Sequence, residues 1–259
     1  MSSGMSSGMR TSRAPWALAT VGVVAIACVG LAGPSAQAHA PGATSVRAAV
    51  TTTLDLEFDD PPGSTVAVDS SGLGHDGSVG SHIRMSGSYA TWDRHPPDAG
   101  IYYGADHLVM VPDAPDGSLD PSAGNFSVEL RYRSTAKFGN VIQKGQARTV
   151  GGQVKFQQPK GVISCMFKSP SGQAAIGSKT PLNDGAWHVV RCERTPTMVT
   201  MYVDGVLRNR IRKATGTIDN TTPWTIGGKF DCDTSDPTVG ADSCDYFPGD
   251  IDYVRLTKG

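Results

Sequence analysis

Two carboxylates alternate with apolar residues near the end of the chain, and they are well suited to hold a cation. In residues 249–259, GDIDYVRLTKG, Asp250 and Asp252 flank Ile251, and a second apolar residue follows at Val254. Apolar and polar residues that alternate with period 2 are typical of a β-strand, and carboxylate oxygens are ligands that Ca²⁺ prefers. We therefore expect a final strand with an inward-pointing Asp252 that can bind a metal ion.

The remaining side chains offer no catalytic pair. The sequence has three glutamates, Glu57, Glu129 and Glu193, which lie far apart along it. Retaining hydrolysis of a glycosidic bond needs two carboxyl groups about 5.5 Å apart, and no closely spaced glutamate motif is present. Residues 39–259 also lack a Gly-x-Ser-x-Gly motif and a histidine cluster. We therefore predict no catalytic residues and a protein that is not an enzyme.

Exposed aromatic rings are candidates for contact with a sugar ligand, because the C–H faces of sugars stack on flat rings. The rings predicted to contact a ligand lie in turn-rich segments or short runs: Trp92, Tyr102, Tyr103 and Trp224. Trp187, Tyr202 and Tyr132 lie in strand-like runs and are assigned to the core. Burial in a two-sheet core is the competing explanation for every ring.

Residues 1–38 have the pattern of a secretory signal peptide. Arg10 and Arg13 precede an apolar run over 14–32, and Ala36 and Ala38 form the small-x-small pattern of a cleavage site. We expect cleavage after Ala38, a disordered leader over 39–50, and a secreted, extracellular product.

Composition narrows the class of partner. The formal net charge is −1 and no basic run is present, which argues against nucleic acid and anionic membranes as partners. After removal of the signal peptide, no apolar stretch approaches the roughly 20 residues of a spanning helix, so we expect no membrane insertion. A neutral extracellular glycan or glycoprotein is the expected partner.

Short runs with period-2 alternation fill residues 51–259 and predict strands. They lie at 52–58, 107–111, 126–133, 141–144, 153–156, 162–167, 174–177, 187–193, 199–203, 206–212, 224–226 and 251–256. Between two of these runs, Asp204-Gly205 is the clearest hairpin, because both residues tolerate the positive φ of a type I′ turn. Many short strands and no amphipathic helix predict one all-β domain over 51–259, a two-sheet antiparallel jelly-roll sandwich.

Four cysteines remain after signal removal, and an even number in an exported chain predicts two disulfides among three possible pairings. Cys165 and Cys192 lie in alternating runs, so their thiols can meet between neighbouring strands. Cys232 and Cys244 flank a loop rich in Asp, Ser, Thr and Gly. We expect the pairs 165–192 and 232–244.

Acidic residues surround the expected Cys232–Cys244 loop. They are Asp231, Asp233, Asp236, Asp242 and Asp245. Such a cluster can take up Ca²⁺ or contact a ligand, and a solvated loop surface is the simpler interpretation.

Seven segments carry a resemblance to a known family: LEFD at 56–59, DSSGLGHDG at 69–77, FSVEL at 126–130, NVIQKG at 140–145, WH at 187–188 with YVDG at 202–205, TIG at 225–227 and FPGDIDYVR at 247–255. With these segments the chain resembles a laminin G-like domain of the concanavalin A-like lectin/glucanase superfamily, in the form found in exported bacterial proteins. The resemblance implies two antiparallel sheets of six or seven strands packed face to face. The functions it implies include glycan binding, adhesion to matrix proteins and accessory roles beside polysaccharide-degrading enzymes.

The resemblance also implies a calcium site where the first and last strands meet. Asp252 is the leading ligand, and Asp59 and Asp69, at the end of the first strand and the start of a turn, are expected to converge on it. The alternative is that Asp69 bonds its own backbone in an Asx turn, Asp59 is solvated, and Asp252 pairs with Arg255 or a turn amide.

These observations predict a secreted, non-catalytic binding module that recognises a polysaccharide or glycoconjugate, with a structural calcium ion as its expected cofactor. Two alternatives stay open. One is a protein-binding adhesion or scaffold module that uses a rim of the sandwich. The other is a divergent glycoside hydrolase or polysaccharide lyase.

Overall fold

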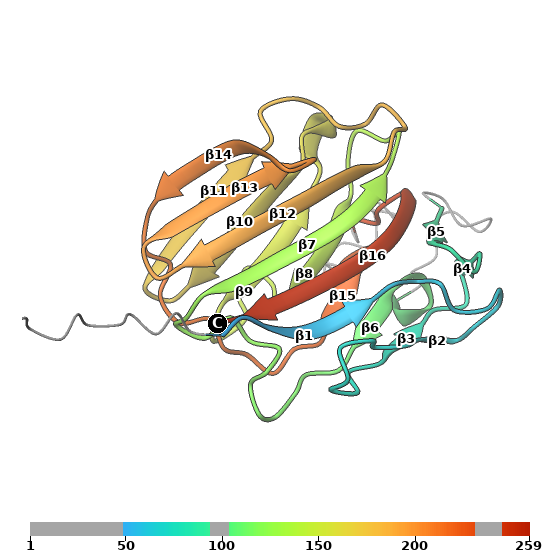
Figure 1. Ribbon diagram of the computed structural model, residues 1–259, viewed down its shortest axis with the longest axis horizontal. Helices are drawn as coiled ribbons and strands as arrows, with labels where there is room; N and C mark the ends of the chain where they lie inside the picture. The colour runs from blue at the N-terminus through green and yellow to red at the C-terminus, as the bar shows by residue number, and fades with distance from the viewer. Residues whose placement is uncertain (1–48, 94–103, 231–244) are drawn as a thin grey trace, which may run out of the picture. The chain divides into compact units, whose positions relative to one another are not determined.

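The computed structural model describes residues 49–93, 104–230 and 245–259, which fold as two antiparallel β-sheets of eight strands each (Figure 1). Two short 3₁₀ turns, Gly104–His107 and Pro159–Gly161, accompany the strands, and these described ranges contain no α-helix. They also contain no helix long and apolar enough to cross a membrane. The all-β, two-sheet antiparallel fold predicted from the sequence is confirmed, whereas the predicted signal peptide and most of the predicted leader lie outside the described residues.

The first sheet, sheet A, contains the first and the last strand. Its strands, in spatial order, are β14 (Val206–Arg212), β13 (Met198–Val203), β12 (His188–Thr195), β7 (Phe126–Arg133), β16 (Gly249–Lys258), β5 (Ala90–Trp92) and β4 (Ile83–Met85), with β1 (Thr51–Leu56) paired to the second half of β16. Figure 1 shows β7 and β16, in green and red, side by side along this sheet.

The second sheet, sheet B, is assembled from the middle of the chain and three short early strands. Its strands, in spatial order, are β11 (Gly172–Gly177), β10 (Ser164–Ser169), β9 (Gln153–Gln157), β8 (Asn140–Lys144), β15 (Trp224–Ile226), β6 (Val109–Val111), β3 (Gly77–Val79) and β2 (Val66–Ala67). Strand β15 lies between β6 and β8, so residues distant in sequence become neighbours on this sheet.

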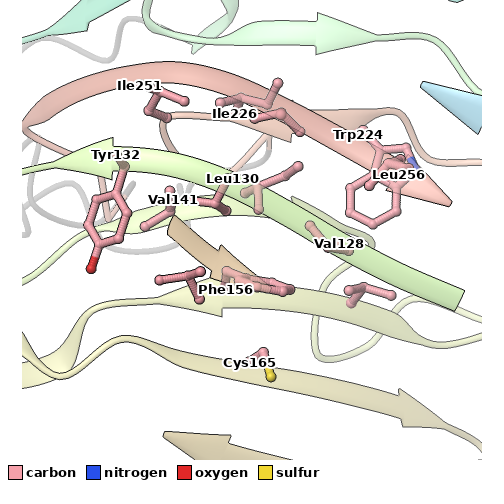
Figure 2. Packing of buried hydrophobic residues seen from close by; sticks show 14 of the residues in the cluster. Val128, Leu130, Tyr132, Val141, Phe156, Cys165, Trp224, Ile226, Ile251 and Leu256 are labelled. Atoms are coloured by element: carbon pink, nitrogen blue, oxygen red, sulfur yellow. The ribbon is translucent and has the colours of Figure 1, made fainter. Parts of the chain in front are cut away.

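The core lies between the two sheets and follows from the alternation of each strand. In β7, Val128, Leu130 and Tyr132 point inward, and the polar residues between them point outward. Figure 2 shows how these side chains meet Phe156 and Trp224 of sheet B between the layers. The Tyr132 hydroxyl donates a 2.8 Å hydrogen bond to the Gln158 side-chain oxygen, which confirms the core assignment of this ring and satisfies its polar end.

The hairpin between β13 and β14 is confirmed. Its two turn residues, Asp204 and Gly205, have φ values of 52° and 75°, as a type I′ turn requires, and Val203 pairs directly with Val206. The Asp204 carboxylate also accepts a 2.9 Å hydrogen bond from the backbone N–H of Val189 in the neighbouring strand. The turn is therefore fixed to β12 as well as to its own hairpin.

A disulfide joins the two sheets. Cys165 lies on β10 of sheet B and Cys192 on β12 of sheet A, and both are buried. The predicted pairing of these cysteines is confirmed, but the expected position between neighbouring strands is wrong. Both side chains point into the core from facing layers, because each shares the parity of the buried residues of its strand. The predicted Cys232–Cys244 pair lies outside the described residues.

Candidate functional site

A groove with a volume of about 990 Å³ lies on the outer face of sheet B. This size is within the range of ligand-binding clefts. The strand residues that line it are Gln143, Gln153, Lys155, Gln157, Met166 and Thr225. Ala105 and residues 145–149, 222–223 and 229–230 complete the described lining. We refer to this feature as the sheet B groove.

The floor of the sheet B groove is a row of side chains that crosses four strands. Thr225 of β15 pairs with Gln143 of β8, Gln143 with Lys155 of β9, and Lys155 with Met166 of β10. Directly opposite residues of antiparallel strands project to the same face at close spacing. The pairing register therefore places a hydroxyl, an amide, an amine and a thioether in line across the groove.

Glutamine amides extend the groove on both sides of this row. Gln153 and Gln157 flank Lys155 at two-residue spacing on β9, so all three side chains share the outer face. The Gln153 amide nitrogen donates to the Gly145 carbonyl at 3.3 Å, and the Gln143 side-chain oxygen accepts a 3.2 Å hydrogen bond from Asn140. These bonds hold two of the amides in defined orientations.

The Lys155 amine lies in a shielded position in the groove. Its side chain is 16% exposed, and its Nζ atom lies 3.9 Å from the Asp245 carboxylate, which binds Lys229 at 2.7 Å. Burial lowers the pKa of Lys155, the Asp245 carboxylate raises it, and the positive charge of Lys229 lowers it, with a net result below the ordinary value. Burial disfavours the charged form of an amine, which explains the direction of the shift.

The outer face of sheet A is different, because the charged side chains of its central strands pair with one another. One row of directly opposed residues runs Asp55, Arg255, Glu129, Arg191 and Tyr202 across five strands. Arg255 binds Asp55 at 3.0 Å, and Arg191 lies over the Tyr202 ring at 4.7 Å from its centroid. Alternating charges in direct opposition stabilise a sheet. The central strands of this face therefore carry paired charges, whereas the arginines of the edge strand β14 are exposed.

A smaller hollow of about 540 Å³ lies at one end of the sheet A face. Two of the polar side chains that line it, Thr91 and Arg133, are each bonded at 2.7 Å to a third, Asp250. The Arg133–Asp250 bond is charge-assisted and so stronger than the neutral bonds of the groove amides, and the sheet B groove is larger, which makes it the stronger candidate site.

Comparison with known families agrees with this architecture. Residues 104–259, more than half of the chain, match the family model Laminin_G_3, described as the concanavalin A-like lectin/glucanases superfamily. The chain belongs to this superfamily. The resemblance drawn from the sequence is therefore confirmed. Comparison with curated proteins returns no match.

Solved structures similar to this chain come from enzymes, toxins and laminins. Domain 4 of AbnA, an extracellular arabinanase of Geobacillus stearothermophilus, is 16% identical with a TM-score of 0.54, and the match covers 81% of this chain and 93% of that chain. The binding domain of Paraclostridial Mosquitocidal Protein 1 is 12% identical with a TM-score of 0.53, covering 80% and 48%. Domains LG4-5 of the mouse laminin alpha1 chain are 21% identical with a TM-score of 0.42, covering 52% and 37%. The last two matches thus span less than half of those chains.

Three carboxylates of this concanavalin A-like domain were predicted to bind calcium, and the structure gives two of them other partners. Asp252 does not point inward: it lies beside a bulge of β16 on the outer face of sheet A, where it binds Arg131 at 2.7 Å. The Asp69 carboxylate accepts hydrogen bonds from three backbone N–H groups, those of Asp55, Ser71 and His75. Asp59 is exposed.

These carboxylates do not fit a calcium site in this arrangement. Within the described ranges, no three side chains of His, Cys, Asp or Glu are grouped as metal ligands. The Asp69 bonds match the Asx-turn alternative, and the Asp252 partner is Arg131 rather than Arg255. Calcium binding at Asp252, Asp59 and Asp69 is untested and stays an expectation from the sequence, to which this arrangement adds no support.

The tryptophans predicted to contact a ligand are placed in the core instead. Trp92 and Trp224 are 1% and 0% exposed. Trp224 stacks on Phe126 with 6.2 Å between ring centroids, and its indole N–H donates to the Leu119 carbonyl at 3.0 Å. Neither ring offers a face to solvent, because each belongs to the inward set of its strand. The other two predicted ligand-binding rings, Tyr102 and Tyr103, lie outside the described residues.

The assignment of Trp187 and Tyr202 to the core is wrong, because both rings lie on the outer face of sheet A. Trp187 is half-buried on the outer face of sheet A, where the guanidinium carbons of Arg131 and Arg133 lie 4.9 and 4.7 Å from its ring centroid. Tyr202 lies on the same face under Arg191. Stacked arginine side chains, rather than the core, cover these rings.

The three glutamates lie on the sheet A face and are separated by arginines. Arg191 lies 3.9 Å from Glu129 and 3.1 Å from Glu193, and Arg255 binds Glu57 at 2.8 Å. Burial, followed by the neighbouring carboxylate of Asp55, raises the pKa of Glu57, and Arg255 opposes this rise. None of the three glutamates lines either hollow.

Of the five aspartates around Cys232 and Cys244, only Asp245 lies within the described residues, and its carboxylate binds Lys229. The other four members lie outside the described residues. The residues of the candidate site that were not predicted from the sequence are the groove amides and Lys155. The sequence signal for these residues was the strand QVKFQ at 153–157, in which Gln153, Lys155 and Gln157 alternate with apolar residues.

Proposed function

We propose that the protein is an exported, non-catalytic module that binds a polysaccharide or glycoconjugate in the sheet B groove. The observation that carries this proposal is the row of amide, amine and hydroxyl groups across four strands of the groove floor. A glutamine amide both donates and accepts hydrogen bonds. Neighbouring hydroxyls of a sugar ring require the same combination of donor and acceptor.

The chemistry of the described lining supports binding rather than hydrolysis. Its strand residues supply amides, a hydroxyl, an amine and the Met166 thioether, which offers an apolar contact for a sugar ring. Retaining hydrolysis requires a pair of carboxyl groups about 5.5 Å apart at the bond to be cleaved. The groove residues of β8, β9, β10 and β15 include no carboxylate.

The comparisons support the same proposal at the level of fold. The AbnA domain, of which 93% is covered, was solved in complex with arabinotriose, and the mosquitocidal structure is a binding domain. The central strands of the outer face of sheet A support the protein-binding alternative less well, because their arginines and carboxylates already pair with one another.

The test is a panel of soluble oligosaccharides measured by calorimetry with the full chain and with Gln157→Ala. Gln157 lines the groove, whereas Gln173 is exposed on β11 of the same sheet and does not line it. Loss of one or two hydrogen bonds of about 0.5 to 1.5 kcal/mol each lowers affinity at least two- to twelvefold. We expect this loss for Gln157→Ala and unchanged affinity for Gln173→Ala.

Two results would contradict the proposal. One is equal affinity of the Gln157→Ala variant and the unchanged chain for every ligand found. The other is release of reducing sugar from a bound polysaccharide, which would establish the hydrolase or lyase alternative.

A further inference from the structure

Acidic residues are distributed unevenly between the two sheets. The eight strands of sheet B contain no Asp or Glu, although they contain the lysines Lys144, Lys155 and Lys168. The strands of sheet A contain five acidic residues, Asp55, Glu129, Glu193, Asp250 and Asp252. All five lie within hydrogen-bond or ion-pair distance of arginines of the same sheet. Lys155 and Lys168 of sheet B therefore have no acidic neighbour within their own sheet, whereas the buried Lys144 binds Asp113 and Asp120 outside it.

The sheet B groove concentrates this cationic character. Arg148, Lys155 and Lys229 line it, and its described lining includes no Asp or Glu. Asp245, which lies beside the groove, binds Lys229 at 2.7 Å, but its distance of 3.9 Å from Lys155 exceeds a hydrogen bond. Among the described residues, Lys155 thus has one ion-pair partner at 3.9 Å and no carboxylate at hydrogen-bond distance.

The position of Lys155 suits recognition of an anion at the centre of a glycan site. Its direct neighbours across the strands are Gln143 and Met166, and Gln157 follows it two residues along β9. An anion bound at Lys155 would place adjacent hydroxyls against the glutamine amides and a ring face against the thioether. Arg148, exposed at the rim, adds positive potential that attracts an anionic ligand.

We propose that the ligand of the sheet B groove is an acidic glycan, whose carboxylate or sulfate group binds the Lys155 ammonium while its hydroxyl groups bind the amides. This inference rests on the proposed function and specifies the class of sugar. It differs from the neutral partner expected from the overall composition, because the composition averages over both sheets. Charge-assisted hydrogen bonds between an ammonium and an anion are about twice as strong as neutral ones.

The electrostatics of the free groove agree with this assignment. Burial first, and the charge of Lys229 as well, lower the pKa of Lys155 despite the opposing effect of Asp245. A negative group that enters the groove supplies the counter-charge that favours the protonated amine.

The test is calorimetry with three oligosaccharides of equal length. An oligogalacturonate supplies carboxylates, a carrageenan oligosaccharide supplies sulfates, and a linear arabino-oligosaccharide is neutral. We expect at least one acidic ligand to bind tenfold or more tightly than the neutral one. Lys155→Met should lower the affinity for that acidic ligand about ten- to a hundredfold, the effect of losing a hydrogen bond to a charged group, and lower the affinity for the neutral ligand by a clearly smaller factor.

Lys213→Met is the matched control, because Lys213 is exposed after β14 on the other sheet. It should leave all affinities unchanged. If Lys155→Met does not fold, Lys155→Gln carries the same test. Neutral binding equal to or tighter than acidic binding overturns the acidic class and leaves the proposed function standing. An unchanged acidic affinity in a folded Lys155 variant overturns the assignment of Lys155, and no binding of any glycan overturns the proposed function itself.

Discussion

The Lys155 amine and the Asp245 carboxylate lie 3.9 Å apart, too far for a hydrogen bond, while the same carboxylate binds Lys229 at 2.7 Å. Lys155 is therefore a shielded amine with a lowered pKa, and it is the charged group of the groove whose loss should be most visible.

The first prediction concerns the pH dependence of binding and stability. Because the pKa of Lys155 lies below the ordinary value of about 10.4, affinity for an acidic glycan should fall as pH rises from 7 through the lowered pKa. The folded state binds fewer protons than the unfolded state between the two pKa values, so the free energy of unfolding should rise with pH in that window. Lys155→Met should remove both effects, as measured by calorimetry and urea unfolding. A parallel pH profile in the variant would contradict the prediction.

The second prediction concerns the disulfide between the sheets. Cys165 and Cys192 are separated by 27 residues in the sequence. Replacing both by alanine removes the constraint that the disulfide places on this loop in the unfolded chain, so the free energy of unfolding should fall by about 3 to 4 kcal/mol. Urea unfolding with and without reductant measures it. A reductant effect that persists in the double variant would report the second predicted bond, Cys232–Cys244, and a double variant as stable as the unchanged chain would refute the prediction.

The third prediction concerns His188, which lies 2.9 Å from Asp204 and 3.1 Å from Asp184. Burial lowers its pKa, but the hydrogen bonds to the two carboxylates raise it more, so the net direction is upward. Its contribution to stability is therefore complete below the unfolded pKa of about 6.5 and is lost as pH rises through the higher folded pKa. His188→Gln should flatten this decline, which we expect to stay below about 1 kcal/mol because the pair is partly solvated. Unfolding curves from pH 5.5 to 8.5 measure it, and a slope that survives the substitution would exclude His188 as its source.

The fourth prediction concerns Asp69, whose carboxylate joins β1 to the turn at 69–75. It accepts hydrogen bonds of 2.9 to 3.0 Å from the N–H groups of Asp55, Ser71 and His75. Burial raises its pKa, but these bonds and that of the Ser71 hydroxyl lower it further, so its stabilising effect should be lost as pH falls through the lowered value. Asp69→Asn should cost about 2 kcal/mol of unfolding free energy, since an amide supplies one acceptor oxygen. The exposed Asp59→Asn is the control and should be neutral.

The fifth prediction concerns metal removal. Because Arg131 binds Asp252 and backbone donors occupy Asp69, the melting temperature should be the same in calcium and in chelator. A decrease with chelator that Asp252→Ala abolishes would instead establish the calcium site expected from the sequence.

Strands long enough to show their alternation could be predicted closely. Runs 126–133 and 206–212 match β7 and β14 residue for residue. The strands β2 to β5, of two or three residues each, display no period and were missed. The equally short β15 was predicted from three consecutive residue types that favour strands, Trp, Thr and Ile. Alternation also shows which residues share a face, but not which layer a strand joins, so the Cys165–Cys192 pair was predicted without its bridge between sheets.

The groove escaped prediction for a related reason. A glutamine in an alternating strand looks the same whether it faces water or a ligand. Gln143 and Thr225 become neighbours only through the placement of β15 against β8, a pairing of residues that are far apart in sequence. Trp187 was misplaced because the arginines that cover it come from β7.

The pairing of β1 with β16 has a mechanical consequence. Thr51 lies opposite Lys258 and Leu56 opposite Val254, so both strands leave the sheet at the same end of their ladder. A pulling force applied through the two ends loads the hydrogen bonds one pair at a time rather than all together. The domain should therefore yield to tension by unzipping from Thr51 toward Leu56, long before the bridge between Cys165 and Cys192 bears any load.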